Sequence, residues 1–142
     1  MKNQVYDNKI FYVAKEEIEK LKEHLATVSD TYVVELEGAD IQTEREYVWE
    51  IDTKLQVPYD ISSRLTLGWY HDDITDCTWI EEKHIILIIR HFDDMLKNCP
   101  KVKQNIIDEF NSVTLPWWGG EIIGHMVGGE PKEFLVYLEV EK

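Results

Sequence analysis

The sequence predicts an α/β protein with a small three-stranded parallel sheet covered by helices. Short apolar runs typical of strands alternate along the chain with segments that have the 3.6-residue periodicity of helices. Strands that are separated by helices pair in parallel through right-handed crossovers. The run Ile85–Ile89 is the longest unbroken aliphatic run, and it is typical of a strand buried on both faces. The 142 residues are enough for one domain, residues 1–142, with its own core.

The first predicted elements are a helix and a strand. Residues 10–13 form a short apolar stretch that is also compatible with a strand. Residues Lys15–Val28 predict a helix, because one stripe is apolar: Ile18, Leu21, Leu25 and Val28. The β-branched and apolar stretch Thr31–Leu36 predicts a strand that stops at Gly38.

Two further helices are predicted before the aliphatic run. Thr43 and Glu46 have the spacing of a capping box, so a helix begins at Thr43. Its expected buried face consists of Tyr47, Val48, Ile51 and Leu55, and Pro58 interrupts the helical pattern after it. Residues Leu65–Cys77 predict a poorly amphipathic helix, in which Gly68 costs about 1 kcal/mol relative to alanine.

The remaining elements come after the aliphatic strand. Residues Phe92–Leu96 predict one or two helical turns, and Pro100 is a suitable first residue for another helix. The apolar stripe of that helix is Val102, Ile106, Phe110 and Val113, and Pro116 is expected to end it. A glycine-rich connection leads to the last strand, Phe134–Val140. The expected order is helix, strand, helix, helix, strand, helix, strand.

The net charge of −13 excludes some classes of partner. Nucleic acids and anionic membrane surfaces both need a cationic protein face. Between Glu35 and Glu82 there are 13 acidic residues and three basic ones, so −10 of the net charge lies in about a third of the chain. Such a concentration fits a basic protein partner, although acidity also serves solubility.

The sequence also bears on compartment and cofactor. Residues 1–7 lack a cationic start followed by an apolar stretch, so no secretory signal peptide is predicted. The run Ile85–Ile89 is too short to span a bilayer. Cys77 and Cys99 do not form a C-x-x-C pair, so both are expected to be reduced thiols in a cytoplasmic protein. No cofactor and no metal are expected.

Three pieces of the sequence carry a resemblance to a known family. They are "VVELEGADIQTEREYVWEIDTKLQVP", "HDDITDCTW" and "HIILIIRHFDDML". Taken together and in this order, the three pieces resemble the barstar family. Its members are intracellular inhibitors of ribonucleases of the barnase type. In that family a strand ends in an LxGxxIxT stretch, here Leu36–Thr43, and a helix closes at a hydrophobic-Pro pair, here Val57-Pro58. The resemblance covers Tyr32 to Leu96, with a looser match to Val140.

The resemblance implies an inhibitor that has no catalytic activity. Family members block the ribonuclease active site with an acidic helix and the loop before it. A ribonuclease site is cationic because it holds phosphates, so a rigidly held carboxylate can replace a phosphate, while Tyr and Trp supply contact area. The partner-binding residues implied here are Tyr59, Asp60, Trp69, Tyr70, Asp72, Asp73, Asp76 and Trp79. Replacing Asp72 or Asp73 by alanine is expected to leave the fold intact.

The alignment with the family has two registers, because the usual Gly-x-Asn-x-Asp-Ala-Leu-like stretch is replaced by residues 62–68. Without a gap, the principal acidic positions fall on Thr66 and Tyr70. With a two-residue insertion they fall on Gly68 and Asp72. The second register is preferred, because it also matches Ile74 to a core leucine. One acidic position is lost in either case.

Three other interpretations remain open. The same scaffold can serve as an immunity or binding protein for a different basic toxin or partner, with a second surface at Trp117, Trp118, Ile122, Ile123 and Met126 that alternatively covers the sheet. A metal-dependent enzyme would use His71, Asp72, Asp73 and Asp76. A purely structural interpretation makes the acidic helix a solvated surface, with Trp69 and Trp79 in the core.

Overall fold

The computed structural model describes residues 5–141, and within them it contains a four-stranded parallel sheet. The strands are β1 (Ile10–Val13), β2 (Thr31–Glu37), β3 (His84–Arg90) and β4 (Glu133–Glu139), in the spatial order β1-β4-β3-β2. The α/β class and the parallel pairing are confirmed. The prediction of three strands is wrong, because the stretch 10–13 pairs with β4.

Strand β1 is held at the sheet edge by packing as well as by backbone pairing. Ile10 is opposite Val136, and Phe11 is opposite Tyr137. The Phe11 and Tyr137 rings stack with their centroids 4.8 Å apart. A stretch of four residues is too short to show a clear two-residue period, so its sequence alone does not separate a strand from a loop.

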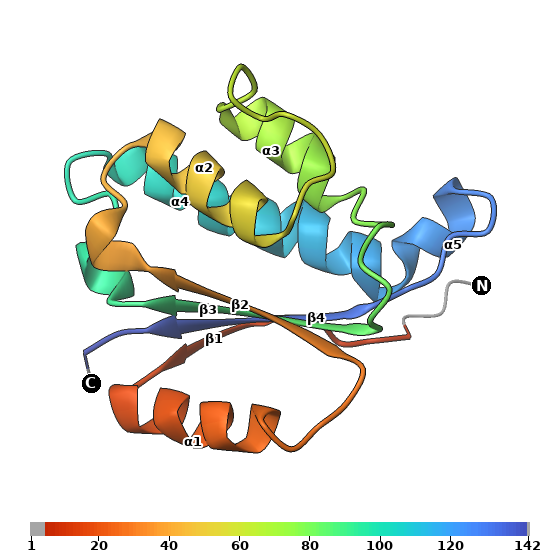
Figure 1. Ribbon diagram of the computed structural model, residues 1–142, viewed down its shortest axis with the longest axis horizontal. Helices are drawn as coiled ribbons and strands as arrows, with labels where there is room; N and C mark the ends of the chain where they lie inside the picture. Colours follow the sequence, from red (N-terminus) through yellow and green to blue (C-terminus); the bar gives the residue numbers. More distant parts are fainter. Residues whose placement is uncertain (1–4, 142) are drawn as a thin grey trace.

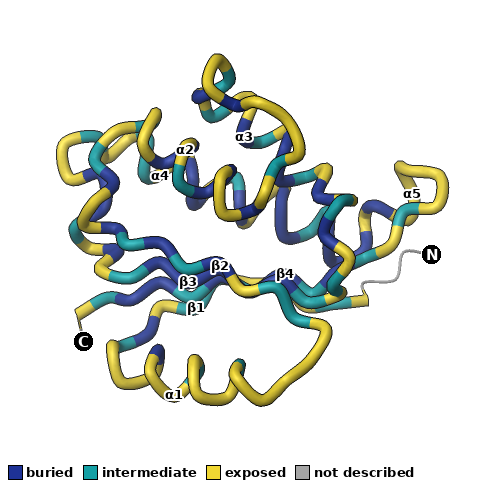
Figure 2. Tube along the Cα trace, in the orientation of Figure 1, coloured by how far each residue is buried: buried dark blue, intermediate teal, exposed yellow. Residues whose placement is uncertain are grey.

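Helices cover both faces of the sheet (Figure 1). One face carries α1 (Lys15–Leu25), whose Ile18 is buried against Val13, Ile86 and Ile88. The other face carries α2 (Glu44–Lys54), α3 (Leu67–Ile74), α4 (Pro100–Glu109) and the short α5 (Ile122–His125). Figure 2 shows the buried residues concentrated along the strands and on the sides of the helices that face them.

The central strand β3 supplies side chains to both layers. Every residue from Ile85 to Ile89 is buried, which confirms a strand covered on both faces. Ile85, Leu87 and Ile89 belong to the main core under α2 and α4, whereas Ile86 and Ile88 belong to the smaller core under α1. This alternation is the two-residue period of a strand.

The stretch Leu36–Thr43 places the start of α2 beside the carboxyl end of β3. A Cβ atom at Gly38 would lie 2.6 Å from the Arg90 carbonyl oxygen, so only glycine allows this approach. Ile41 is buried, and Thr43 then caps α2: its Oγ1 accepts from the Glu46 N–H at 3.0 Å, and Glu46 reaches back to the Thr43 N–H at 3.1 Å. The predicted capping box is confirmed.

The helix that begins at Pro100 does not end at Pro116. Wider π-helical turns at 110–114 and 117–121 carry the chain past the proline, and the non-helical backbone of Gly120 in the second turn makes a kink before α5. Such turns accommodate a residue without a backbone N–H, which is why the expected stop is absent. Trp118, in the second of these turns, is buried, and its indole N–H donates to the Ile74 carbonyl at 2.9 Å. Within residues 5–141 no helix has the length and apolar character needed to cross a membrane.

Candidate functional site

The loop between α2 and α3, and α3 itself, carry most of the predicted binding residues. Five of the eight are exposed: Tyr59, Asp60, Trp69, Asp72 and Asp76. Tyr70 and Asp73 are buried, and Trp79 is partly buried. The predicted set therefore divides into an exposed group and a group that supports it from inside.

Helix α3 has an exposed face because its beginning is fixed. Thr66 caps it by accepting from the Trp69 N–H at 3.4 Å, and Glu44 of α2 accepts from the Leu67 N–H at 2.8 Å. These contacts orient the helix so that Tyr70 and Ile74 face the core, while Trp69 and Asp72 face solvent.

Arg64 lies between two of the exposed aromatic residues. Its Cζ atom is 4.5 Å from the centre of the Tyr59 ring and 3.9 Å from the centre of the Trp69 ring. Its terminal Nη2 also lies 3.1 Å from Asp73 Oδ1. We call Tyr59, Arg64 and Trp69 the aromatic stack. Arginine on an aromatic face is a favourable cation–π contact.

Asp73 anchors this stack from beneath. Its Oδ1 atom accepts hydrogen bonds from the Tyr59 hydroxyl and from Arg64, although the Asp73 side chain is only 1% exposed. The hydrogen bond to Asp73 raises the pKa of Tyr59 to about 12, with burial as a smaller cause. Tyr59 is therefore a neutral hydrogen-bond donor at physiological pH.

Tyr70 and Trp79 are tied to the protein interior. The hydroxyl groups of Tyr70 and Tyr47 are 2.9 Å apart, and their rings meet edge to face. Burial, foremost, raises the pKa of Tyr70 far above its usual value. The Trp79 indole N–H donates to the Leu55 carbonyl at 2.8 Å. In this conformation Tyr70 presents no surface to a partner.

Exposed carboxylates lie around the aromatic stack. Asp60 comes directly after Tyr59, and its Oδ1 accepts from the Ser62 N–H at 2.9 Å. That hydrogen bond lowers the pKa of Asp60, so this group is charged over a wide pH range. Asp72 and Asp76 are exposed on and just after α3. The aromatic stack and these three carboxylates together form what we call the α3 surface.

The residues of the metal interpretation do not converge. His71 turns toward Glu109 of α4, with 3.5 Å between Nδ1 and Oε1, whereas Asp73 is bound to Arg64 and Tyr59. Over residues 5–141 there is no group of three or more His, Cys, Asp or Glu side chains that could hold a metal ion.

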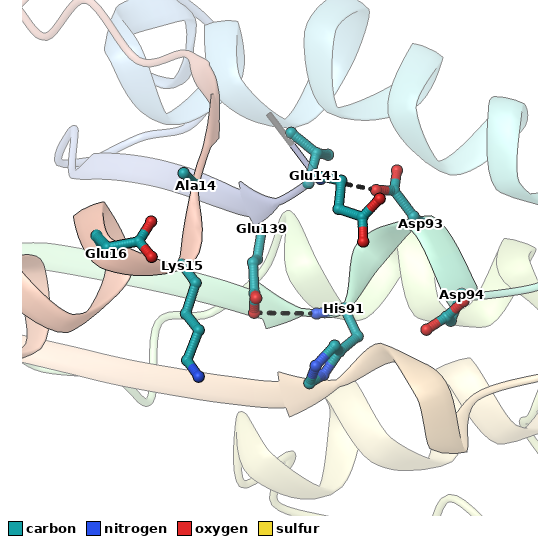
Figure 3. Close-up of a pocket in the computed structure, with 9 residues that line it drawn as sticks. Ala14, Lys15, Glu16, His91, Asp93, Asp94, Glu139 and Glu141 are labelled. Atoms are coloured by element: carbon teal, nitrogen blue, oxygen red, sulfur yellow. Dashed lines mark hydrogen bonds between the residues drawn. The ribbon is translucent and has the colours of Figure 1, made fainter.

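A separate crevice of about 410 Å³ lies at the carboxyl ends of β1, β3 and β4 (Figure 3). Its acidic lining residues are Glu16, Asp93, Asp94, Glu139 and Glu141. Three of these carboxylates have partners in the protein: Glu139 accepts from Arg90 and from the His91 N–H, Asp93 accepts from the Glu141 N–H, and Asp94 Oδ1 lies 3.3 Å from Lys97 Nζ. His91 turns its ring toward Glu37 at 2.9 Å. The crevice is a polar junction in which these partners stabilise the strand ends.

The segment of residues 117–126 partly covers the sheet and partly remains exposed as a candidate second surface. Trp118 and Ile122 are buried and complete the core, whereas Ile123 and Met126 are exposed. The exposed Val127 extends this small apolar area.

Comparisons of the chain with protein-family models, with curated proteins and with solved structures found no match. The functional assignment therefore depends on the fold and on the α3 surface.

Proposed function

We propose that this protein is an inhibitor that binds a basic ribonuclease or toxin nuclease and blocks its active site with the α3 surface. The observation that carries the proposal is the aromatic stack, which is anchored on buried Asp73 and surrounded by the exposed carboxylates of Asp60, Asp72 and Asp76. The stack supplies aromatic contact area, and the carboxylates supply fixed negative charge. An inhibitor of a phosphate-binding protein site needs both.

The aromatic stack is ordered before any partner arrives. Tyr59 and Trp69 are exposed by 43% each, yet both rings are held against Arg64. Ordering side chains on binding costs about 0.5–1.5 kcal/mol each, so rings that are already positioned retain more of their contact energy. Because Asp73 neutralises Arg64, the other carboxylates determine the charge of the surface.

The orientation of α3 supports the register with a two-residue insertion. In that register Asp72 takes the principal acidic position and Ile74 takes a core position. Asp72 is exposed, and Ile74 is completely buried. In the ungapped register the same position falls on Tyr70, whose side chain is buried. Asp72 is therefore the carboxylate that we assign to the partner's cationic site.

The proposal includes a cytoplasmic location. Cys77 and Cys99 are free thiols, and their Sγ atoms contact backbone carbonyls, that of Asp73 at 3.5 Å and that of Gln42 at 3.7 Å. Thiols used in this way fit a reducing compartment. An inhibitor in that compartment would protect the cell that makes the nuclease.

The proposal is tested by capture of the partner. The immobilised protein is exposed to the secreted and toxin proteins of its own host, and the bound proteins are identified and assayed for RNA cleavage. We expect a basic nuclease whose activity is lost at a stoichiometric amount of this protein. Recovery of metabolic enzymes alone, with no basic nuclease or toxin, would contradict the proposal.

Matched variants show whether the α3 surface is responsible for binding the partner. Asp72→Asn removes one exposed charge from this surface, and Glu23→Gln removes one from α1 on the opposite face of the sheet. We expect Asp72→Asn to weaken binding by about 2–5 kcal/mol, the usual cost of leaving a partner's buried charge unpaired. Glu23→Gln should leave affinity unchanged, and equal losses would place the interface elsewhere.

A further inference from the structure

A groove beside α2 has features of a second contact region. Its volume is about 530 Å³, and its lining includes Asp40, Glu46, Trp49, Glu50, Ser62 and Leu65. Trp49 is 46% exposed, although it belongs to a helix with a well-packed buried face. That face consists of Tyr47, Val48, Ile51 and Asp52, so Trp49 contributes little to the core. Exposed tryptophan is enriched among residues that dominate binding energy.

The charge of the groove is negative, and part of it is rigidly held. Glu46 and Glu50 are four residues apart on α2, so they share a helix face. The Glu46 carboxylate is fixed by the N–H groups of Gln42 at 2.8 Å and Thr43 at 3.1 Å. Asp40 adds a carboxylate from the turn before α2, and Arg45 is the basic residue of the lining.

One loop contributes residues to both the groove and the α3 surface. Ser62 and Leu65 line the groove, and Arg64, between them in sequence, stacks on Tyr59 and Trp69. The same loop therefore supports both regions. A partner that covers the aromatic stack lies close to the groove. The protein itself shows how arginine packs on an exposed tryptophan, because Arg64 lies 3.9 Å from the Trp69 ring centre.

We propose that this groove binds an extended, arginine-containing segment of the same basic partner, with a guanidinium group stacked on Trp49 and paired with Glu50 and Asp40. This inference rests on the proposed function, because that function supplies the basic partner. Stacking on an aromatic face favours the planar guanidinium of arginine over the compact ammonium of lysine.

The first test uses the full-length protein and two synthetic peptides, hexa-arginine and hexa-lysine, and therefore does not need the natural partner. Indole N–H signals are followed by NMR, and the Trp49 signal is assigned with Trp49→Phe. We expect saturable shifts of the Trp49 indole and of the Leu65 methyl groups, with at least a several-fold preference for hexa-arginine. Trp49→Ala should abolish this preference and retain the thermal stability of the parent protein.

Charge variants separate the groove from general attraction to an acidic protein. Asp40→Asn combined with Glu50→Gln should weaken hexa-arginine binding by about tenfold. Glu16→Gln combined with Glu23→Gln removes the same charge from α1 and should change it much less. Equal effects of the two pairs, or an arginine preference that survives in Trp49→Ala, would overturn the inference.

The captured nuclease separates this inference from the proposed function. If Trp49→Ala weakens nuclease binding by tenfold or more, the groove is part of the interface. If the nuclease is captured and inhibited but Trp49→Ala binds it as the parent does, the inference is wrong and the function stands. If no basic partner is captured, the function fails, and the peptide titration still decides whether the groove selects arginine.

Discussion

Asp52 on α2 and Asp73 on α3 form a pair of buried acidic side chains, which are only 0% and 1% exposed. Burial, foremost, and the nearby Asp73 raise the pKa of Asp52 to about 8, while Arg64 opposes the shift. Neither Asp52 oxygen has a hydrogen-bond partner among residues 5–141. Asp52 therefore keeps its proton at neutral pH, which avoids a second buried negative charge beside the helix that carries the proposed binding surface.

The proton on Asp52 makes the stability of the protein depend on pH. The folded-state pKa of about 8 lies above the usual value of 3.8, so the folded protein binds more protons than the unfolded chain between these values. The stabilising contribution is complete below the unfolded-state pKa and is lost as pH rises through the folded-state pKa. We expect Asp52→Asn, which stays neutral at every pH, to reduce this loss by a few kcal/mol, since one pKa unit corresponds to about 1.4 kcal/mol. Urea denaturation between about pH 5 and pH 9 measures the effect.

The control for this experiment is Glu50→Gln, because Glu50 lies on the same helix but lines the open groove beside it. Its stability should match that of the parent protein to within about 0.5 kcal/mol at every pH, because it loses only an exposed ion pair with Lys54. If the curves of Asp52→Asn and the parent run parallel, the buried carboxyl pair does not titrate as described.

Asp72 and Asp73 are adjacent in sequence but should respond in opposite ways to substitution. Asp73→Ala removes the buried partner of Arg64 and Tyr59, so we expect the free energy of unfolding to fall by about 3 kcal/mol. Asp72→Ala removes an exposed charge and should change stability by less than about 0.5 kcal/mol. Thermal and urea denaturation of both variants test this difference. Equal stability of the two variants would show that the anchor beneath the aromatic stack contributes nothing.

The burial of Asp73 argues against the expectation that both aspartates can be replaced without harm to the fold. Helix spacing places Asp72 and Asp73 about 100° apart, but it does not say which of them faces the core when the helix is poorly amphipathic. The burial of Asp52 could have been anticipated, because this residue comes after Ile51 on the stripe that also contains Val48 and Leu55. A buried aspartate on that stripe indicates a polar partner in the core.

Sheet order and the aromatic stack depend on contacts that the sequence does not reveal. The aliphatic run Ile85–Ile89 is sufficient to identify the central strand, and the Thr43 capping box identifies the start of α2. The short β1 becomes a strand only because β4 offers it an edge, and Arg64 reaches the α3 surface only because the loop folds back over α3. Both are long-range packing effects, which outweigh local propensity.

Gly38 and Gly68 provide a matched test of the fold that supports the site. A Cβ atom at Gly38 would lie 2.6 Å from the Arg90 carbonyl oxygen, whereas a Cβ atom at Gly68 would come no closer than 3.9 Å to Thr66 Oγ1. We expect Gly38→Ala to cost about 2 kcal/mol by forcing β3 and the turn after β2 apart. Gly68→Ala should stabilise the protein by about 0.5 kcal/mol, because alanine favours a helix. Urea denaturation with an unchanged m-value measures both, and a Gly38→Ala protein as stable as the parent would contradict the close approach.

Association with the captured partner should depend strongly on salt. The exposed carboxylates of the α3 surface attract a basic partner over a range that shrinks from about 10 Å at 0.1 M salt to about 3 Å at 1 M. The association rate should therefore fall as salt rises, while the dissociation rate changes less, because it depends on contacts already formed. Stopped-flow measurements give both rates.

Asp72→Asn combined with Asp76→Asn should flatten the salt dependence more than Glu16→Gln combined with Glu23→Gln, which removes the same charge from α1. An association rate that does not change with salt would exclude electrostatic steering and favour an apolar interface, for which Ile123, Met126 and Val127 are exposed.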